Sequence, residues 1–148
     1  MTLIEEALTQ TTDTKACEIG PGAVASATPM FRSLFPEAGK AIVVDDANTK
    51  RVAGDAVVAA LKAARVEVAE HTINPDGTWF HATYDKVEEV RDAIAAAGGA
   101  IPVAVGSGTI NDLVKRGADE IGVRYMVVGT AASMDGFTAA TPPSPRTG

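Results

Sequence analysis

Short apolar runs alternate with segments of helical periodicity along most of this chain. The runs KAIVVDD, VEVAEHTI, IPVAV and RYMVV occupy residues 40–46, 66–73, 101–105 and 124–128. Runs of this length and composition are typical of buried strands. Strands separated by helices indicate βαβ units, so we predict an α/β fold with a parallel sheet flanked by helices. The 148 residues are about one domain's length, which we place at residues 1–140, followed by a Pro-rich tail at 141–148.

The segments around these runs carry apolar residues at helical spacing. Helices are expected within residues 22–35, 48–66, 84–99 and 109–122. In the helix after the first strand, Asn48 or Thr49 is the expected cap, and its expected apolar face is Val52, Ala56, Val57, Ala60, Leu61 and Ala64. The two later helices are expected to bury Val87, Val90 and Ile94, and Ile110, Leu113, Val114 and Ile121. Their predicted ends are the glycines at positions 98, 99 and 122.

Polar and small residues follow three of the predicted strands. Asp45 and Asp46 end the first strand, residues 106–109 follow the third, and residues 130–133 follow the fourth, with Asp135 just beyond. In an open parallel sheet, ligands bind outside the carboxyl ends of the strands. The coincidence of these features at one edge of the sheet therefore predicts a ligand site there.

Each of these features also has a purely structural interpretation. A Gly-Ser-Gly turn can simply reverse the chain, but glycines at a helix start also let a pyrophosphate approach free backbone N–H groups. The spacing is not that of the common G-x-G-x-x-G fingerprint. An acid at the end of the first strand can cap the next helix or bind a ribose diol, and we favour Asp46 over Asp45 for the ribose. Taken alone, Asp135 resembles a turn aspartate.

Charge and composition exclude several classes of function. The net charge of −6 argues against a nucleic-acid or anionic-membrane surface, and no apolar run reaches the ~20 residues of a membrane span. With one cysteine and an acidic start, we expect a cytoplasmic protein. His71 and His81 lack a third partner for a metal. Trp79 and Phe80, which follow a Pro-Gly turn, are expected to pack in the core or at its rim rather than form a stacking platform.

Three stretches together resemble a known family. These stretches are similar to the N-terminal half of the glycerol-1-phosphate dehydrogenases. They are VVDDANTKRVAG, VAVGSGTINDLVK and VVGTAASMDGFTA, with CEIGPGA near the start. That family belongs to the iron-containing alcohol dehydrogenase and dehydroquinate synthase-like superfamily. The resemblance implies a Rossmann-like NAD(P)-binding domain of an enzyme that interconverts dihydroxyacetone phosphate and sn-glycerol 1-phosphate. It also implies a Zn or Ni ion, held by a helical C-terminal domain of the full-length enzyme.

The resemblance implies a role for each matching residue. Asp46 would bind the adenosine ribose, and Asp135 would contact the substrate. The phosphate loop would consist of Gly106, Ser107, Gly108, Thr109 and Ile110, and the cofactor site would continue through Thr130, Ala131, Ala132 and Ser133. No catalytic residue and no metal ligand is assigned within this chain.

The departures from the family pattern shape the expected activity. Ala139 stands where the family often has a serine that touches the cofactor, and the residues that hold the metal in the family have no counterpart before Gly148. We therefore interpret the chain as a truncated or isolated nucleotide-binding half, inert alone, with an uncovered apolar face that favours self-association into a homo-oligomer. Two alternatives stay open: a stand-alone nucleotide-binding module without catalysis, or the N-terminal half of a glycerol dehydrogenase or dehydroquinate synthase relative.

Overall fold

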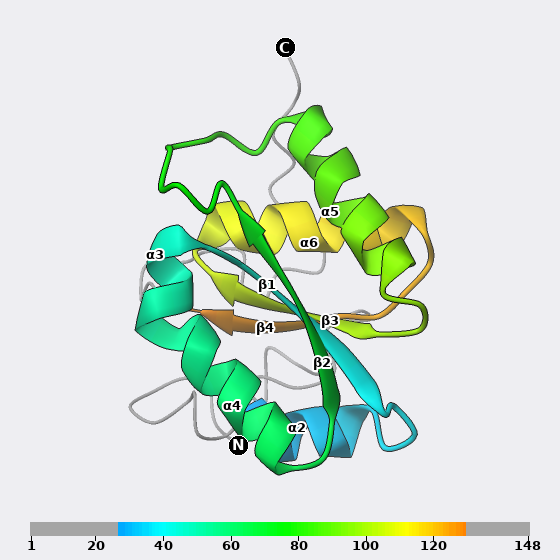
Figure 1. Cartoon of the computed structure of the whole chain (residues 1–148). Helices are drawn as coiled ribbons and strands as arrows, with labels where there is room; N and C mark the ends of the chain where they lie inside the picture. The colour runs from blue at the N-terminus through cyan, green and yellow to red at the C-terminus, as the bar shows by residue number, and fades with distance from the viewer. Residues whose placement is uncertain (1–26, 130–148) are drawn as a thin grey trace, which may run out of the picture.

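The computed structural model describes residues 27–129, which form a parallel sheet with helices on both faces (Figure 1). The four strands are β1 (Lys40–Asp46), β2 (Glu67–Ile73), β3 (Ile101–Gly106) and β4 (Met126–Gly129). The helices are α2 (Ala27–Leu34), α3 (Ala47–Thr49), the π-helical segment η2 (Lys50–Gly54), α4 (Asp55–Ala63), α5 (Tyr84–Ala96) and α6 (Gly108–Glu120). The predicted α/β fold with a parallel sheet flanked by helices is thus confirmed. No described helix is long and apolar enough to cross a membrane.

The order of the strands is β2-β1-β3-β4, and every neighbouring pair is parallel. The chain therefore runs outward from β1 to β2 and then crosses back to place β3 on the other side of β1. Such a reversal of winding is a topological switch point, and it opens a crevice between the carboxyl ends of the two strands. Here the switch point lies between the ends of β1 and β3.

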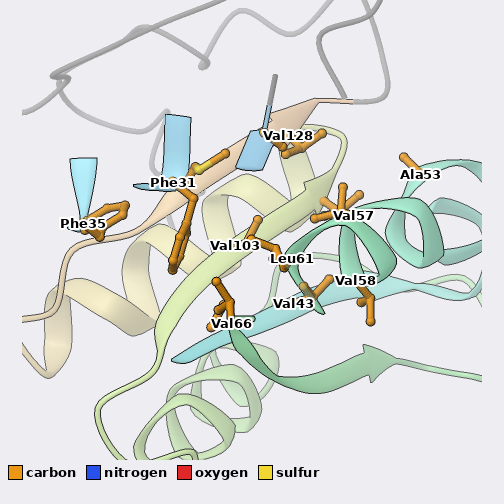
Figure 2. Close-up of a cluster of buried hydrophobic side chains, with 14 residues drawn as sticks. Phe31, Phe35, Val43, Ala53, Val57, Val58, Leu61, Val66, Val103 and Val128 are labelled. Carbon is orange, nitrogen blue, oxygen red and sulfur yellow. The ribbon is translucent and has the colours of Figure 1, made fainter. Parts of the chain in front are cut away.

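The central strands are buried on both faces. On β1, Ala41 and Val43 pack into one hydrophobic cluster while Ile42 and Val44 pack into the other, as the alternation of strand side chains requires. The first cluster, shown in Figure 2, is closed by apolar side chains of α2 and α4, which are Ala27, Phe31, Val57, Val58 and Leu61. The second is closed by α5 and α6, through Val87, Val90, Ile94, Ile110, Leu113 and Val114.

The helical region after β1 begins earlier than expected and changes its winding. Asp46, rather than Asn48 or Thr49, is the N-cap, and it forms a capping box with Thr49. The Asp55 N–H then bonds to the Lys50 carbonyl, five residues back, as in a π-helix. This wider turn rotates the face that follows, so the buried residues are Ala53, Val57, Val58 and Leu61. The predicted burial of Val52 and Ala56 is wrong, because both are exposed.

The later helices follow the predictions more closely. Six of the apolar residues expected in the core are buried, namely Val87, Val90, Ile94, Ile110, Leu113 and Val114. The seventh, Ile121, lies beyond the end of α6 and is exposed. The glycines at positions 98, 99 and 122 adopt positive φ angles of 52°, 79° and 70° after the helix ends, which confirms them as terminators. Pro29 lies in the first turn of α2, where a missing N–H does no harm.

Candidate functional site at the carboxyl edge of the sheet

The turn between β3 and α6 presents free backbone donors at the switch point. Ser107 is the N-cap of α6, and its side chain makes no capping bond. The Asn111 N–H donates to the Ser107 carbonyl at 3.1 Å. The N–H groups of Gly108, Thr109 and Ile110 precede that bond and have no carbonyl partner within the helix. They lie at the positive end of the helix dipole, which favours an anion.

The two glycines of this turn serve different purposes. A Cβ at Gly106 would lie 2.6 Å from Cγ1 and 2.8 Å from Cβ of Ile110, so this glycine allows the first turn of α6 to pack against β3. A Cβ at Gly108 would meet nothing within 4 Å. Close packing therefore explains why position 106 is a glycine, but it does not explain the glycine at position 108. The open space beside Gly108 could hold a ligand.

Asp46 closes the end of β1 and carries a partly exposed carboxylate. Its Oδ1 accepts a hydrogen bond from the Thr49 N–H at 2.8 Å, and its own N–H donates to Thr49 Oγ1 at 3.0 Å. An ionised carboxylate can accept several hydrogen bonds, so capping leaves acceptor capacity for a ligand. The capping box also fixes the orientation of this side chain.

Asp45 faces the interior instead. It is 2% exposed, and its Oδ1 accepts a hydrogen bond from the Thr72 hydroxyl on β2 at 2.7 Å. Its Oδ2 would lie 2.3 Å from a Cβ at Gly54, so the π-helical segment packs closely on this carboxyl. Burial raises the pKa of Asp45 to about 6, against the opposing effects of the Thr72 hydrogen bond and of Lys50. The structure thus separates the two neighbouring acids into a buried one and a partly exposed one.

The start of α6 carries two polar side chains that lack hydrogen-bond partners among the described residues. Asn111 is 2% exposed, and its Oδ1 has no hydrogen-bond partner within residues 27–129. The neighbouring Asp112 has an equally unpartnered Oδ1, and burial raises its pKa while Lys115 and Arg116 oppose the rise. A buried acceptor without a partner is unusual in a folded protein. Asn111 in the first turn of α6 is therefore a candidate to meet a ligand.

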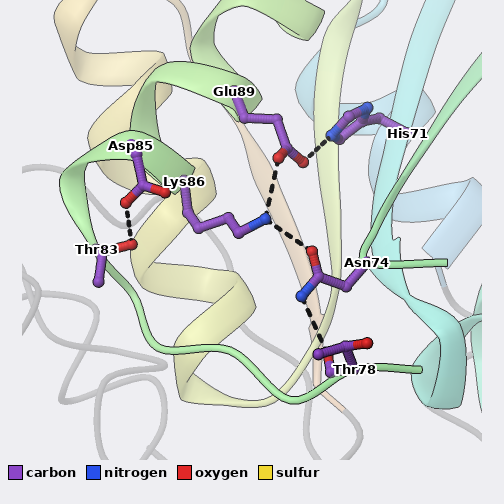
Figure 3. Close-up of polar contacts among 7 residues, drawn as sticks. All are labelled: His71, Asn74, Thr78, Thr83, Asp85, Lys86 and Glu89. Atoms are coloured by element: carbon purple, nitrogen blue, oxygen red, sulfur yellow. Dashed lines mark hydrogen bonds and ion pairs between the residues drawn. The ribbon is translucent and has the colours of Figure 1, made fainter. Parts of the chain in front are cut away.

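A hydrogen-bond network fixes the loop between β2 and α5 (Figure 3). Lys86 on α5 donates to Asn74 Oδ1 at 2.7 Å and contacts Glu89 Oε1 at 3.2 Å. Glu89 Oε2 lies 2.8 Å from Nε2 of His71 on β2. The Asn74 amide in turn donates to the Thr78 carbonyl at 3.1 Å. These contacts attach the loop to both of its flanking elements.

The predicted site residues divide into two groups. Asp46 and residues 106–110 lie at the same edge of the sheet, at the ends of the adjacent strands β1 and β3. The side chain of Ile110 is fully buried, so its N–H alone can serve a ligand. Thr130, Ala131, Ala132, Ser133 and Asp135 lie outside the described residues. Within 27–129, no three His, Cys, Asp or Glu residues are grouped so that they could hold a metal ion.

Comparisons with solved structures place this architecture among dehydrogenases and related synthases. A probable glycerol dehydrogenase from Sinorhizobium meliloti aligns over 74% of this chain and 28% of its own, with a TM-score of 0.53 and 26% identity. A 2-deoxy-scyllo-inosose synthase, solved with NAD⁺ and Co²⁺, shares the fold at a TM-score of 0.51 and 16% identity, over 70% of this chain and 29% of its own. The Rossmann-like, dehydroquinate synthase-like class is thereby confirmed.

Curated relatives agree with these structures. The glycerol-1-phosphate dehydrogenase [NAD(P)⁺] of Methanothermobacter thermautotrophicus is 32% identical over 120 residues, which are 81% of this chain and 32% of the relative. The enzyme of the same name from Thermococcus kodakarensis is 36% identical over 102 residues, 69% of this chain and 27% of the relative. The chain thus spans between about a quarter and a third of the length of these relatives. The family model for iron-containing alcohol dehydrogenases matches residues 18–144, and the chain therefore belongs to that family.

Proposed function

We propose that this chain is the NAD(P)-binding part of an oxidoreductase of the glycerol-1-phosphate dehydrogenase type. The observation that carries the proposal is the switch point, because it brings a partly exposed acid on β1 beside a glycine turn that opens α6. Dinucleotides bind at such points in open α/β sheets, with the pyrophosphate at a helix N-terminus and an acid on the ribose. The names of the curated relatives support the choice of cofactor and substrate.

The residues present fit a dinucleotide. The open space beside Gly108 lets a pyrophosphate approach the N–H groups of Gly108, Thr109 and Ile110. Asp46, oriented by its capping box, would accept hydrogen bonds from the adenosine ribose hydroxyls. The unpartnered Oδ1 of Asn111 lies in the same first turn of α6, where it would accept a hydrogen bond from a hydroxyl of the cofactor rather than from its phosphates. This chain's contribution would be to bind and orient the cofactor.

Further residues complete the proposed site. The cofactor site would extend toward the nicotinamide through Thr130, Ala131, Ala132 and Ser133. Asp135 would bind the phosphorylated substrate. The nicotinamide, when bound, would exchange a hydride in the interconversion of sn-glycerol 1-phosphate and dihydroxyacetone phosphate. Among residues 27–129, no group of His, Cys, Asp or Glu side chains fits a divalent metal.

Asp46→Asn tests the proposed ribose contact. Asparagine is as good an N-cap as aspartate, so the capping bond to the Thr49 N–H should persist and thermal stability should hardly change. Loss of the negative charge should weaken NADH binding about threefold to tenfold, because a hydrogen bond to a neutral amide is weaker than one to a carboxylate. Repulsion of a 2′-phosphate should also decrease, so the ratio of NADPH to NADH affinity should rise. Fluorescence titration of the two reduced cofactors measures both effects, and an unchanged ratio would count against the contact.

A further inference from the structure

Trp79 is the most exposed large apolar side chain in the described part of the chain. It is 75% exposed, compared with 60% for Val52 and 43% for Tyr84. Trp79 therefore does not pack in the core, one of the two positions expected for it, whereas Phe80 does pack against the second hydrophobic cluster. An indole held in water leaves a large apolar surface without a partner, and exposed aromatic surface of this kind often marks a binding site.

The loop that carries Trp79 leaves the sheet beside the proposed ribose site. Ile73, the last residue of β2, is paired with Asp46, the last residue of β1. The strand order therefore places three features in sequence along one edge: the phosphate turn after β3, the ribose acid at the end of β1, and this loop after β2. Figure 1 shows the loop rising from the end of β2 on the side where α3 begins. Three neighbouring strands span about 10 Å, since strands lie ~4.8 Å apart.

These three features lie in the same order as the pyrophosphate, the ribose and the adenine in the adenosine half of a dinucleotide. A pyrophosphate at residues 106–108 and a ribose at Asp46 direct the adenine away from β3, toward the β2 side. The base would then arrive where the loop leaves the sheet. No other described element follows β2 at this edge before α5.

The loop holds Trp79 in place and leaves part of its indole available. Asp76 accepts hydrogen bonds from the N–H and hydroxyl of Thr78, at 3.0 and 2.8 Å. Asn74, which is anchored by Lys86, binds the Thr78 carbonyl. Three hydrogen bonds therefore hold Thr78, the residue before Trp79, in place. Trp79 makes a T-shaped contact with His81, with centroids 4.1 Å apart, and such a contact uses at most one face of the indole.

The charges around the loop favour a neutral partner. Asp76 is exposed within the loop, and the carboxyl of Asp85 accepts a hydrogen bond from Thr83 at the start of α5. The pKa of each carboxyl is lowered, by the hydrogen bonds from Thr78 and Thr83 respectively, so both stay ionised. Lys86 brings a positive charge to the same loop, but its ammonium is held by Asn74 and Glu89. The two carboxylates of the loop therefore still disfavour a phosphate or a carboxylate at this place. An uncharged aromatic base does not meet that repulsion.

We propose that Trp79 stacks on the adenine ring of the bound dinucleotide and is a positioning residue for the adenosine half of the cofactor. This proposal rests on the proposed function, because it needs a nucleotide at the switch point. It assigns to the loop between β2 and α5 a role in affinity and in the choice of base. The nicotinamide half of the cofactor would not contact Trp79.

The test compares Trp79→Ala and Trp79→Phe with wild type, and uses Tyr84→Ala as the matched control. Tyr84 is also an exposed aromatic residue, but its hydroxyl bonds to Glu120 at the end of α6. The probes are NADH and reduced nicotinamide mononucleotide, which lacks adenosine, and binding is followed by dihydronicotinamide fluorescence. Trp79 is the single tryptophan of the chain, so quenching of its emission by ADP in the wild type gives a second readout.

Trp79→Ala is expected to weaken NADH binding about 5- to 100-fold, the range for base–aromatic stacking. Trp79→Phe should keep most of the affinity, Tyr84→Ala should match wild type, and binding of the mononucleotide should be unchanged in all variants. Equal NADH affinity in wild type and Trp79→Ala would overturn the stacking proposal while leaving the proposed function intact. A wild-type chain that binds neither NADH nor ADP would overturn both.

Discussion

Replacing Asp45 with asparagine is expected to stabilise the protein by about 1–3 kcal/mol near pH 8. Asp45 is almost fully buried at the end of β1, and burial raises its pKa from 3.8 to about 6. At pH 8 the folded protein therefore holds a buried negative charge. Asparagine has no such charge, and its side-chain oxygen can keep the hydrogen bond from the Thr72 hydroxyl.

The pH dependence of this effect has a definite sign. Because the pKa of Asp45 is higher in the folded protein than in the unfolded chain, the folded protein binds the extra proton between about pH 4 and pH 6. Its stability therefore decreases as the pH rises through that range. The advantage of Asp45→Asn should be largest near pH 8 and should fall to roughly a third or less near pH 4.

Urea unfolding followed by circular dichroism at the two pH values measures this difference. Asp46→Asn is the matched control, because it removes a neighbouring charge from a partly exposed N-cap and should give no comparable gain. If Asp45→Asn proved less stable than wild type at pH 8, or if the two proteins differed equally at both pH values, the charge of Asp45 would not be the source of the effect.

Gly106→Ala is expected to destabilise the protein by about 2–3 kcal/mol, the upper part of the range for overpacking. The added methyl group would lie 2.6 Å from Cγ1 of Ile110, whose side chain is fully buried between β3 and α6. The first turn of α6 must then move away from the sheet. For a chain of this size, the expected decrease in melting temperature is about 5–10 °C.

The neighbouring glycine supplies the control for that experiment. Gly108→Ala places its methyl group where no atom lies within 4 Å, so the melting temperature should stay close to that of wild type. A double-mutant cycle gives an independent check, because Gly106→Ala combined with Ile110→Ala should cost less than the sum of the two single changes. Strict additivity would show that the Gly106–Ile110 contact is not responsible for the loss.

Most of the fold could be predicted from local patterns. The runs at residues 40–46 and 101–105 are apolar because both faces of β1 and β3 are covered by helices. Strands of this kind can be recognised from the sequence alone. The region after β1 is less predictable. A π-helical turn changes the 3.6-residue period, and it forms where Gly54 packs against Asp45. That contact is made between segments and leaves no periodic signal.

The candidate site, like the fold, could be predicted only in part from the sequence. The glycine turn and Asp46 could be located because ligands gather at the carboxyl ends of parallel strands. The switch point between β1 and β3, in contrast, depends on the strand order, which a list of strands does not contain. The exposure of Trp79 and the unpartnered Asn111 follow from the path of a loop and from packing around α6. Neither residue type carries a sequence signal that distinguishes a buried position from a ligand-facing one.

Titration of NADH into wild type and Gly108→Ala tests whether the edge formed by β1 and β3 holds a dinucleotide. Saturable binding to wild type is expected. In Gly108→Ala the methyl group occupies the space of the approaching pyrophosphate, so affinity should fall about tenfold, or ~1.4 kcal/mol, at an unchanged melting temperature. A folded wild-type chain without saturable NADH binding, or a variant that binds NADH as tightly as wild type, would show that this edge does not hold the dinucleotide.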